Sequence, residues 1–311
     1  MGNSALKTSH YYRELSSIIA RFTGSDGEFH TAIGNLFFNR RSSPSQPLHT
    51  AQWPCFALVT QGAKSLTLGD EVFNYGVGDY LVVSMDLPVV SRVTQATAKV
   101  PHLGLGMAID GGRLREVLER VSVPRVAATV DGMRGVAVNT SPLELLDATL
   151  RLLRLLDRPE DIPMMAPLIE QEILYRLLTG PYGPKLLRIA ATDSPSNKIA
   201  KAIAWLRQHY TRQLRIEDLA DYVGMSVSSL HHHFSSVTAM TPMQYQKRLR
   251  LHEARRLMLV ERLDVGTAGY RVGYRSPSQF SREYSRLYRL SPLRDVESMR
   301  EPIGGEIVIP R

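Results

Sequence analysis

The chain has 311 residues, 43% of them hydrophobic and 22% charged, a composition typical of a globular protein with room for two cores. No apolar run approaches the length of a membrane span, and the N-terminus lacks a cationic segment followed by an apolar one, so neither a membrane helix nor a secretory signal is predicted. A single cysteine, Cys55, excludes an intramolecular disulfide and favours the cytoplasm. We expect Cys55 to be a buried, inert thiol, the alternative being a redox sensor.

The net charge of +8 is concentrated at one end of the chain. From Lys198 onward there are 19 Lys and Arg against 11 Asp and Glu, whereas the residues before Lys198 carry 19 of each kind. A basic excess confined to one segment indicates a surface for nucleic acid, the alternative being a solvated basic face without a partner.

The N-terminal part begins with an amphipathic helix over Tyr11–Phe22 and then changes to short strands separated by glycine-containing turns. Strands are predicted at Asn35–Asn39, Phe56–Thr60, Ser65–Leu68, Glu71–Tyr75, Tyr80–Ser84 and Val89–Thr94. Such spacing is typical of a β-sandwich or small barrel, which can hold a small molecule in its interior. Five polar or aromatic side chains are candidates to bind such an effector, although each could instead lie on the rim or surface: His49, Trp53, Gln61, Tyr80 and Arg92.

Helices are predicted between the strands and the basic segment, at Gly111–Val121, Pro142–Asp157 and Met165–Leu178. The second and third of these carry apolar stripes, formed by Leu143, Leu146, Leu150 and Leu153, by Leu145, Leu152 and Leu156, and by Leu168, Ile169, Ile173 and Leu177. A helix that is apolar on two sides packs against more than one neighbour. We therefore predict a homodimer through residues 142–178, with packing onto the protein's own barrel as the alternative. Residues 191–197 are polar and contain proline, and they form the predicted linker.

After a helix over Ile199–Tyr210, the basic segment repeats one layout twice: a helix, a glycine turn, a serine N-cap and a second helix. Residues 216–237 use Gly224 for the turn, because glycine adopts a positive φ at low cost, and Ser226 for the cap. The buried face of the second helix is predicted to consist of Leu230, His233, Phe234 and Val237. This is the helix-turn-helix layout.

The second copy, residues 264–288, uses Gly273 for the turn and Ser276 for the cap, with Pro277 at the first helical position. Its apolar stripe is predicted to consist of Phe280, Tyr284 and Leu287. A long helix from Pro242 to about Leu259 joins the two copies. This helix would set the recognition helices about one duplex turn apart, ~34 Å, so that both enter the major groove on one face of the DNA.

Two helix-turn-helix units joined by one helix and ending in GYRSPSQFSREYSRLYRLSP resemble the AraC/XylS family of bacterial transcription regulators. The resemblance covers roughly Lys198–Asp295, and the stretch ALVTQGAKSLTLGDEVFNYGVGDYLVVS resembles the cupin-like N-terminal domain of that family. It implies an α+β multidomain fold, with a cupin-like β-barrel and associated helices in residues 1–190 and an all-α DNA-binding domain in residues 198–311. Two positions depart from the family. Arg289 stands where glycine is usual, and Gly269 replaces a usual alanine and is expected to loosen its helix.

The resemblance implies a cytoplasmic, sequence-specific regulator that binds double-stranded DNA, responds to a small-molecule effector and contacts RNA polymerase if it is an activator. Two alternatives stay open: an enzyme in the barrel, and a protein-interaction module that does not bind DNA. A metal-binding cupin carries two histidines one residue apart on a strand, and Thr31–Asp110 contains no such pair. We therefore predict no catalytic residue, no metal and no cofactor. The basic last third argues against the interaction module.

The outward faces of the two recognition helices supply the predicted DNA contacts. Base contacts are predicted for Ser228, His231, His232, Ser278, Ser281 and Arg282. Arg282 is the strongest candidate for a bidentate contact to guanine. Phosphate contacts, which set the register on the duplex without reading its sequence, are predicted for Ser226, Ser276, Arg248 and Arg250.

Three consecutive histidines, His231, His232 and His233, could suggest a metal site. Consecutive helical residues point about 100° apart, so three in a row cannot close on one ion, and no metal is predicted here. His233 is predicted to face the core beside Phe234 and to have a local partner.

Overall fold

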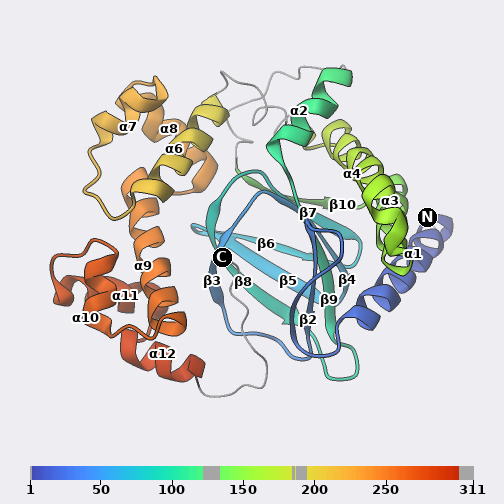
Figure 1. Ribbon diagram of the computed structural model, residues 1–311, viewed down its shortest axis with the longest axis horizontal. Coiled ribbons are helices and arrows are strands. Elements are labelled where there is room, and N and C mark those ends of the chain that lie inside the picture. Colours follow the sequence, from blue (N-terminus) through green and yellow to red (C-terminus); the bar gives the residue numbers. More distant parts are fainter. Residues whose placement is uncertain (1, 122–133, 184–185, 187–194, 301–311) are drawn as a thin grey trace.

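The computed structural model describes residues 2–121, 134–183, 186 and 195–300. Figure 1 shows a central β-structure with α1 (Gly2–Phe22), α3 (Leu143–Arg154) and α4 (Ile162–Thr179) on one side. The C-terminal helices lie on the other side of the β-structure. The predicted class, β-rich first and helical afterwards, is confirmed, and the first helix begins earlier than the predicted Tyr11.

The strands of the described residues form two antiparallel sheets, ordered β1-β2-β9-β4-β7-β10 and β3-β8-β5-β6. Their bounds are β1 Gly27–His30, β2 Leu36–Arg41, β3 Leu48–Gln52, β4 Cys55–Gln61, β5 Ala63–Leu68, β6 Glu71–Gly76, β7 Asp79–Val83, β8 Leu87–Gln95, β9 His102–Ala108 and β10 Val136–Thr140. All six predicted strands are present, with ends shifted by a few residues at most. Strands β1, β3, β9 and β10 were not predicted.

β9 shows why a strand can escape a pattern search. It lies between β2 and β4 in the larger sheet, yet its sequence HLGLGMA contains two glycines, which weaken a strand signal. Gly106 is opposite Phe37 of β2, and the Phe37 ring occupies the space that a Cβ on Gly106 would need. The ring supplies the packing surface that the glycine lacks, so the strand is stabilised by its neighbour rather than by its own residues.

The outer face of the larger sheet packs on α1, α3 and α4, where Phe38, Phe56 and Leu105 contact the helices. The predicted leucine stripe is buried in this core, because Leu146, Leu150 and Leu153 are each at most 2% exposed. Of the two alternatives, packing within the protein's own N-terminal region holds for this stripe, which shares one core with α1, α4 and the sheet. The stripe stabilises the protomer itself.

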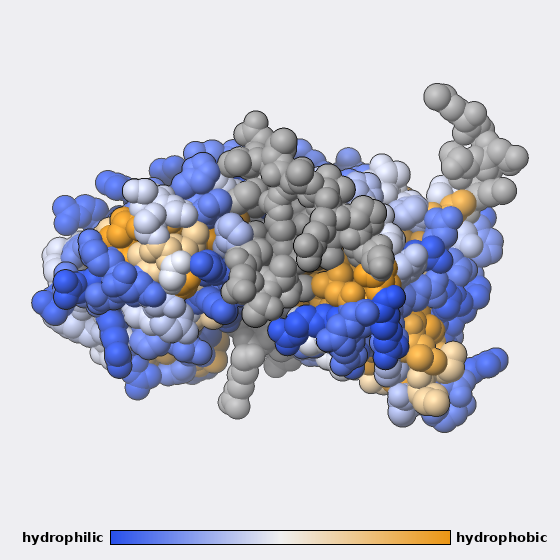
Figure 2. Space-filling view, turned by 90° about the horizontal axis from the view of Figure 1, so that it is seen from above, coloured by the Kyte–Doolittle hydropathy of each residue, from blue (hydrophilic) through white to orange (hydrophobic). Residues whose placement is uncertain are grey.

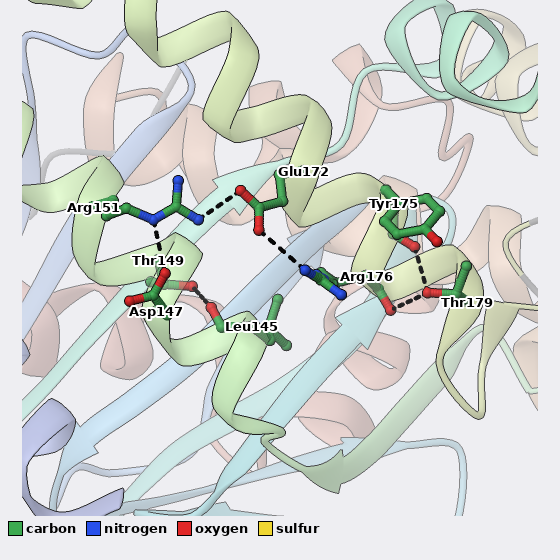
Figure 3. Close-up of polar contacts among 8 residues, drawn as sticks. All are labelled: Leu145, Asp147, Thr149, Arg151, Glu172, Tyr175, Arg176 and Thr179. Atoms are coloured by element: carbon green, nitrogen blue, oxygen red, sulfur yellow. Dashed lines mark hydrogen bonds and ion pairs between the residues drawn. The ribbon is translucent and has the colours of Figure 1, made fainter. Parts of the chain in front are cut away.

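Charged side chains join α3 to α4 (Figure 3). Arg151 of α3 donates to Glu172 of α4 at 2.6 Å and to Asp147 of its own helix at 2.8 Å. Arg176 approaches the other oxygen of Glu172 at 3.4 Å. All four side chains are partly exposed, so each pair contributes little free energy, and the buried leucines hold the two helices together.

The remaining helices of the described residues lie in the C-terminal region, apart from α2 (Gly111–Arg120) and two short 3-10 turns, Leu155–Asp157 and Pro159–Asp161. They are α6 (Pro195–His209), α7 (Ile216–Val223), α8 (Val227–Thr238), α9 (Pro242–Val260), α10 (Val265–Arg271), α11 (Pro277–Tyr288) and α12 (Pro292–Arg300). Both predicted pairs, α7–α8 and α10–α11, are present, and α9 joins them. Helix α6 begins inside the predicted linker, whose residues 191–194 lie outside the described part of the chain.

Glycine and serine take their predicted places at both turns. Gly224 follows α7 with φ +63°, and Gly273 follows α10 with φ +93° and lies against the backbone of Thr211. Ser226 accepts a hydrogen bond from the Ser229 N–H at 3.2 Å, and Ser276 accepts one from the Gln279 N–H at 3.3 Å. Local chemistry alone therefore starts and stops these helices.

The two departures from the family pattern have visible consequences. Arg289 follows α11 with φ +63°, a left-handed conformation that glycine would adopt with less strain. Gly269 is buried, and a Cβ there would lie 3.1 Å from the Phe280 ring. The glycine thus allows α10 to approach α11 closely, which offsets its low helix propensity.

A buried ion pair joins α9 to α12. Arg255 donates from Nε to Asp295 Oδ2 and from Nη2 to Asp295 Oδ1, both at 2.7 Å. The Tyr284 hydroxyl of α11 donates to the same carboxylate at 2.6 Å. The Arg255 and Asp295 side chains are only 12% and 5% exposed. Helix α11 of the second helix-turn-helix unit and the flanking helices α9 and α12 therefore converge on one carboxylate.

We expect Asp295→Ala to lower the free energy of unfolding by roughly 3–5 kcal/mol, because it leaves the Arg255 charge buried without its partner. Urea unfolding followed by circular dichroism measures this loss. Glu297→Ala, an exposed position in the same helix, is the matched control and should change stability by less than about 0.5 kcal/mol. A loss below about 1 kcal/mol for Asp295→Ala would contradict the structural role of the pair.

Candidate nucleic-acid interface

The first set of predicted base contacts lies on the outer face of α8. Ser228 and His232 are exposed and His231 is half-buried, whereas Leu230 and Phe234 on the opposite face are buried. This face is small and polar enough to approach a base pair.

His233 departs from its prediction. It is half-buried rather than in the core, and its Nδ1 has no hydrogen-bond partner among the described residues. Its partner is the ring of His232, which it meets nearly edge-on with centroids 5.2 Å apart. The predicted core position of His233 is therefore wrong, while its local partner is the neighbouring ring.

The second set lies on the outer face of α11. Ser278 and Arg282 are exposed and Ser281 is half-buried, while Phe280 and Tyr284 point into the core. Within the described residues, no acidic side chain pairs with Arg282, although Arg255 and Arg256 nearby are both paired. The Arg282 guanidinium is therefore available for a ligand.

Two exposed residues near the start of α11 were missed. Arg275 precedes the N-cap, and Gln279 follows it in the first turn, where its Nε2 contacts Glu283 at 3.3 Å. The N-terminal turn of a recognition helix is the part that reaches base edges, so long polar side chains around its cap are candidates for base contacts. Amide groups pair with adenine, and arginine pairs with guanine or phosphate.

Of the two arginines predicted to bind phosphate, Arg250 is engaged within the chain and Arg248 is half-buried. Arg250 donates to the carbonyl oxygens of Tyr210 at 2.6 Å, Arg212 at 2.7 Å and Gly273 at 3.4 Å. Arg248 is half-buried near Asp70 of the N-terminal region, and burial lowers its pKa. Among the predicted phosphate contacts, the N-caps Ser226 and Ser276 are the ones placed at open helix ends.

Helices α9 and α6 pack against the N-terminal region. Tyr245 of α9 is 1% exposed, and its hydroxyl donates to the backbone oxygen of Asp86 at 2.9 Å. Arg207 of α6 forms an ion pair with the Asp86 carboxylate. One residue of the segment between β7 and β8 therefore holds two C-terminal helices.

Arg134 attaches the C-terminal end of the first recognition helix to the N-terminal region. Its Nη1 donates to the carbonyl oxygens of Ser235 at 2.9 Å and Ser236 at 3.0 Å, and its Nε donates to Glu71 at 2.8 Å. The adjacent Gly135 N–H donates to the Val237 oxygen at 3.0 Å. Carbonyls at a helix C-terminus carry partial negative charge, so a guanidinium stabilises them. The orientation of α8 thus depends on contacts far from its DNA face.

Two histidines meet across the same interface. His49 of β3 lies 4.9 Å from Tyr288 and 6.0 Å from His252 of α9, measured between ring centroids. The Tyr288 hydroxyl lies 3.2 Å from His252 Nδ1. Burial, reinforced by the charges of Arg248 and Arg255, lowers the pKa of His49 to about 4 and that of His252 to about 3.

The five predicted effector residues do not gather around one cavity. His49 faces α9, and Trp53 packs on the Phe37 ring with centroids 5.6 Å apart. Gln61 donates to the Pro101 oxygen at 2.7 Å, and Arg92 donates to the Ser45 oxygen at 3.1 Å. The hydroxyl of the buried Tyr80 accepts from Asn139 at 3.3 Å. Gln61 alone of these five lines the pocket between α1 and the β-structure.

Other titratable groups, which were not predicted from the sequence, occupy the space between the two sheets. Lys64 lies close enough to Glu28 and to His102 to influence the pKa of both, and burial lowers the pKa of His102 to about 3. His102 is fully buried, and neither ring nitrogen has a hydrogen-bond partner among the described residues. Cys55 is buried in the same interior as predicted, and burial raises its pKa to about 12.

Across the described ranges, no three His, Cys, Asp or Glu side chains are grouped as metal ligands would be. In the same ranges, no helix combines the length and apolarity needed to cross a bilayer.

Family comparisons match both halves of the chain. The AraC-type transcriptional regulator N-terminus matches residues 32–185, and a helix-turn-helix domain matches residues 219–296. Two similar proteins are called HTH-type transcriptional activator RhaS. The one from Salmonella arizonae is 30% identical over 166 residues, 53% of this chain and 58% of its own length. The one from Salmonella schwarzengrund is 31% identical over 160 residues, 51% of this chain and 56% of its own length. This chain thus matches a little over half the length of these relatives.

Solved structures share the fold at low sequence identity. ToxT from Vibrio cholerae O395 superposes with a TM-score of 0.55 and 11% identity, covering 86% of this chain and 99% of ToxT. ToxT from V. cholerae strain SCE256, in a structure with a bound unsaturated fatty acid, gives a TM-score of 0.53 and 10% identity, covering 84% of this chain and 93% of that one. At this identity the likeness establishes the arrangement of elements.

We expect the free energy of unfolding to fall as the pH is lowered from about 6.5 towards about 4. In this window the unfolded chain binds protons at His49 and His252 while the folded chain does not, so acid favours unfolding; above about pH 6.5 both states are neutral there. His49→Gln should reduce the slope of stability against pH, measured by urea unfolding at several pH values. Equal slopes for the variant and the wild type would show that the His49 imidazole is not held neutral at the interface.

Proposed function

We propose that this chain, which belongs to the AraC family of transcription regulators, binds double-stranded DNA through α8 and α11 and thereby controls transcription. The observation that carries the proposal is the pair of capped recognition helices, each with an exposed polar face, joined by one helix. Both lie in the part of the chain that holds the whole basic excess. Bases are contacted by Ser228, His231, His232, Ser278, Ser281 and Arg282. Phosphates are bound by Ser226 and Ser276. Arg250 reaches phosphate only if its present hydrogen bonds open, and Arg248 only if its half-buried side chain turns outward.

We infer further that residues 1–190 form a cupin-like regulatory domain, residues 191–197 a linker and residues 198–311 the DNA-binding domain. A small-molecule effector acts through the regulatory domain, in the cytoplasm and without enzymatic turnover. The ToxT structure with a bound fatty acid supports ligand binding by this fold, and the Arg134 contacts to α8 supply a physical route from ligand to DNA. If the protein is an activator, as the RhaS names suggest, RNA polymerase is a further partner.

Selection of binding sites from a random duplex pool, followed by fluorescence anisotropy, tests DNA binding. Arg282→Ala should weaken binding to the selected site by roughly 1–3 kcal/mol and relax preference at one base pair, because a bidentate guanine contact is lost. Arg294→Ala, an exposed arginine of α12, removes the same charge away from the recognition helices and is the control.

No selected sequence, or equal losses for the two variants on specific and random DNA, would contradict this assignment. Binding should also fall steeply with salt, since released counterions drive association with phosphates.

We also propose a homodimer through α4, which presents exposed apolar residues despite the burial of the leucine stripe. Met164, Leu168 and Tyr175 are 74%, 54% and 38% exposed. Figure 2 shows hydrophobic surface among polar side chains on both halves of the molecule, including the right-hand half, which carries α3 and α4 in Figure 1. A contiguous apolar patch on a soluble protein usually marks an interface.

We expect Met164→Glu/Leu168→Glu to give a folded monomer at about 20 μM by sedimentation velocity, because two buried charges would oppose association. Val72→Glu, which changes an apolar side chain 58% exposed elsewhere, should leave the dimer intact. A wild-type monomer at the same concentration, with and without operator DNA, would refute the dimer.

A further inference from the structure

A pocket of about 780 Å³ lies where α1 crosses the ends of β4 and β9. Its walls come from α1, from the end of β4, from the turn between β6 and β7 and from the segment between β8 and β9. Figure 1 shows α1 lying along this side of the β-structure, away from the C-terminal helices. The volume falls within the range of small-molecule sites, roughly 300–1,000 Å³.

The lining of the pocket is cationic and contains no acid. Arg13 of α1, Arg40 of β2 and Lys99 of the segment before β9 line it, and among the described residues that line it none is Asp or Glu. Within the described residues, none of the three forms an ion pair. Three unpaired cations around one concave space repel one another, which an anion would relieve.

The absence of acids is specific to the pocket. Arg21, also on α1, pairs with Asp157 at 2.8 Å, and Arg154 of α3 pairs with Glu14 of α1 at 2.7 Å. Arg21 and Arg154 are therefore neutralised by carboxylates, whereas Arg13, Arg40 and Lys99 are not.

Hydrogen bonds hold the walls in place. Ser16 of α1 donates to the Thr60 oxygen at 3.0 Å, and Gln61 donates to the Pro101 oxygen at 2.7 Å. Arg40 donates one N–H to the Thr23 oxygen at 3.0 Å, which leaves the rest of its guanidinium for a ligand. The cations thus surround a site whose frame is already built.

We propose that this pocket binds a small organic molecule with at least two negative charges, of the polycarboxylate or phosphate-ester class. Guanidinium groups bind two oxygens of a carboxylate or of a phosphate through paired N–H bonds, and three cations match two or three charges. Leu103, Val77 and Ala20 supply apolar contacts for the carbon frame of the ligand. The site is separate from the DNA-binding surface, and binding of the anion does not rest on the proposed function.

Isothermal titration of the full chain with citrate, glucose 6-phosphate and uncharged glucose tests the site. At about 0.15 M salt we expect one saturable site per chain, with Kd below about 1 mM, for at least one of the two anions and no binding of glucose. Arg13→Gln/Lys99→Gln should weaken binding by about 10-fold or more, while Arg40 is kept because it also holds Thr23.

The matched control is Arg115→Gln/Arg120→Gln in α2, which removes the same charge from exposed positions outside the pocket and should leave the affinity unchanged. Saturation by citrate alone or by glucose 6-phosphate alone identifies the class and supports the proposal. No saturable binding of either anion below about 5 mM, or equal loss in both double variants, overturns it. Anisotropy with DNA on the same proteins separates the two proposals: a wild type that binds an anion but no DNA refutes only the regulatory function.

Discussion

The packing of α9 is the constraint on which the rest of this structure depends. Its start is fixed by a capping box between Thr241 and Gln244, and its side chains hold four other parts of the chain. Tyr245 reaches the N-terminal region, Arg250 holds the loop before α7 and the turn after α10, and Arg255 holds α12. Because one rigid helix makes all these contacts, neither recognition helix can shift without disturbing a buried group.

The sequence predicted what short-range chemistry decides. Turns and caps depend on residues only a few positions apart, so a single sequence is enough to predict them. The glycine turns at Gly224 and Gly273 and the serine caps at Ser226 and Ser276 located both recognition helices in this way. Contacts between residues far apart in the chain could not be predicted from the sequence. β9 owes its packing to Phe37 of another strand, and Arg134 reaches a helix about a hundred residues further on. Nothing local to these positions indicates their partners.

The leucine stripe of α3 illustrates a second limit. Its spacing correctly predicted a buried face but could not say what buries it, since an apolar stripe fits equally well against a sheet or a second copy. The structure assigns Leu146, Leu150 and Leu153 to the intramolecular core and leaves Met164 and Leu168 of α4 exposed. The candidate effector residues could not be placed for a similar reason. Successive residues of a strand point to opposite faces of the sheet, so the face of a given residue can be predicted only when the register of the strand is known.

The attachment of α8 at its C-terminal end has a thermodynamic consequence. Arg134 and Gly135 contact the last carbonyls of this helix, while its first turns carry the polar face. Any ligand of the N-terminal region that alters these contacts changes the free energy of placing α8 in a groove. Linkage is reciprocal, so the duplex must change the affinity of that ligand by the same factor. The operator is then an effector of the regulatory domain as much as the small molecule is an effector of DNA binding, and in a cell the DNA-bound chains and the free chains would have different ligand affinities.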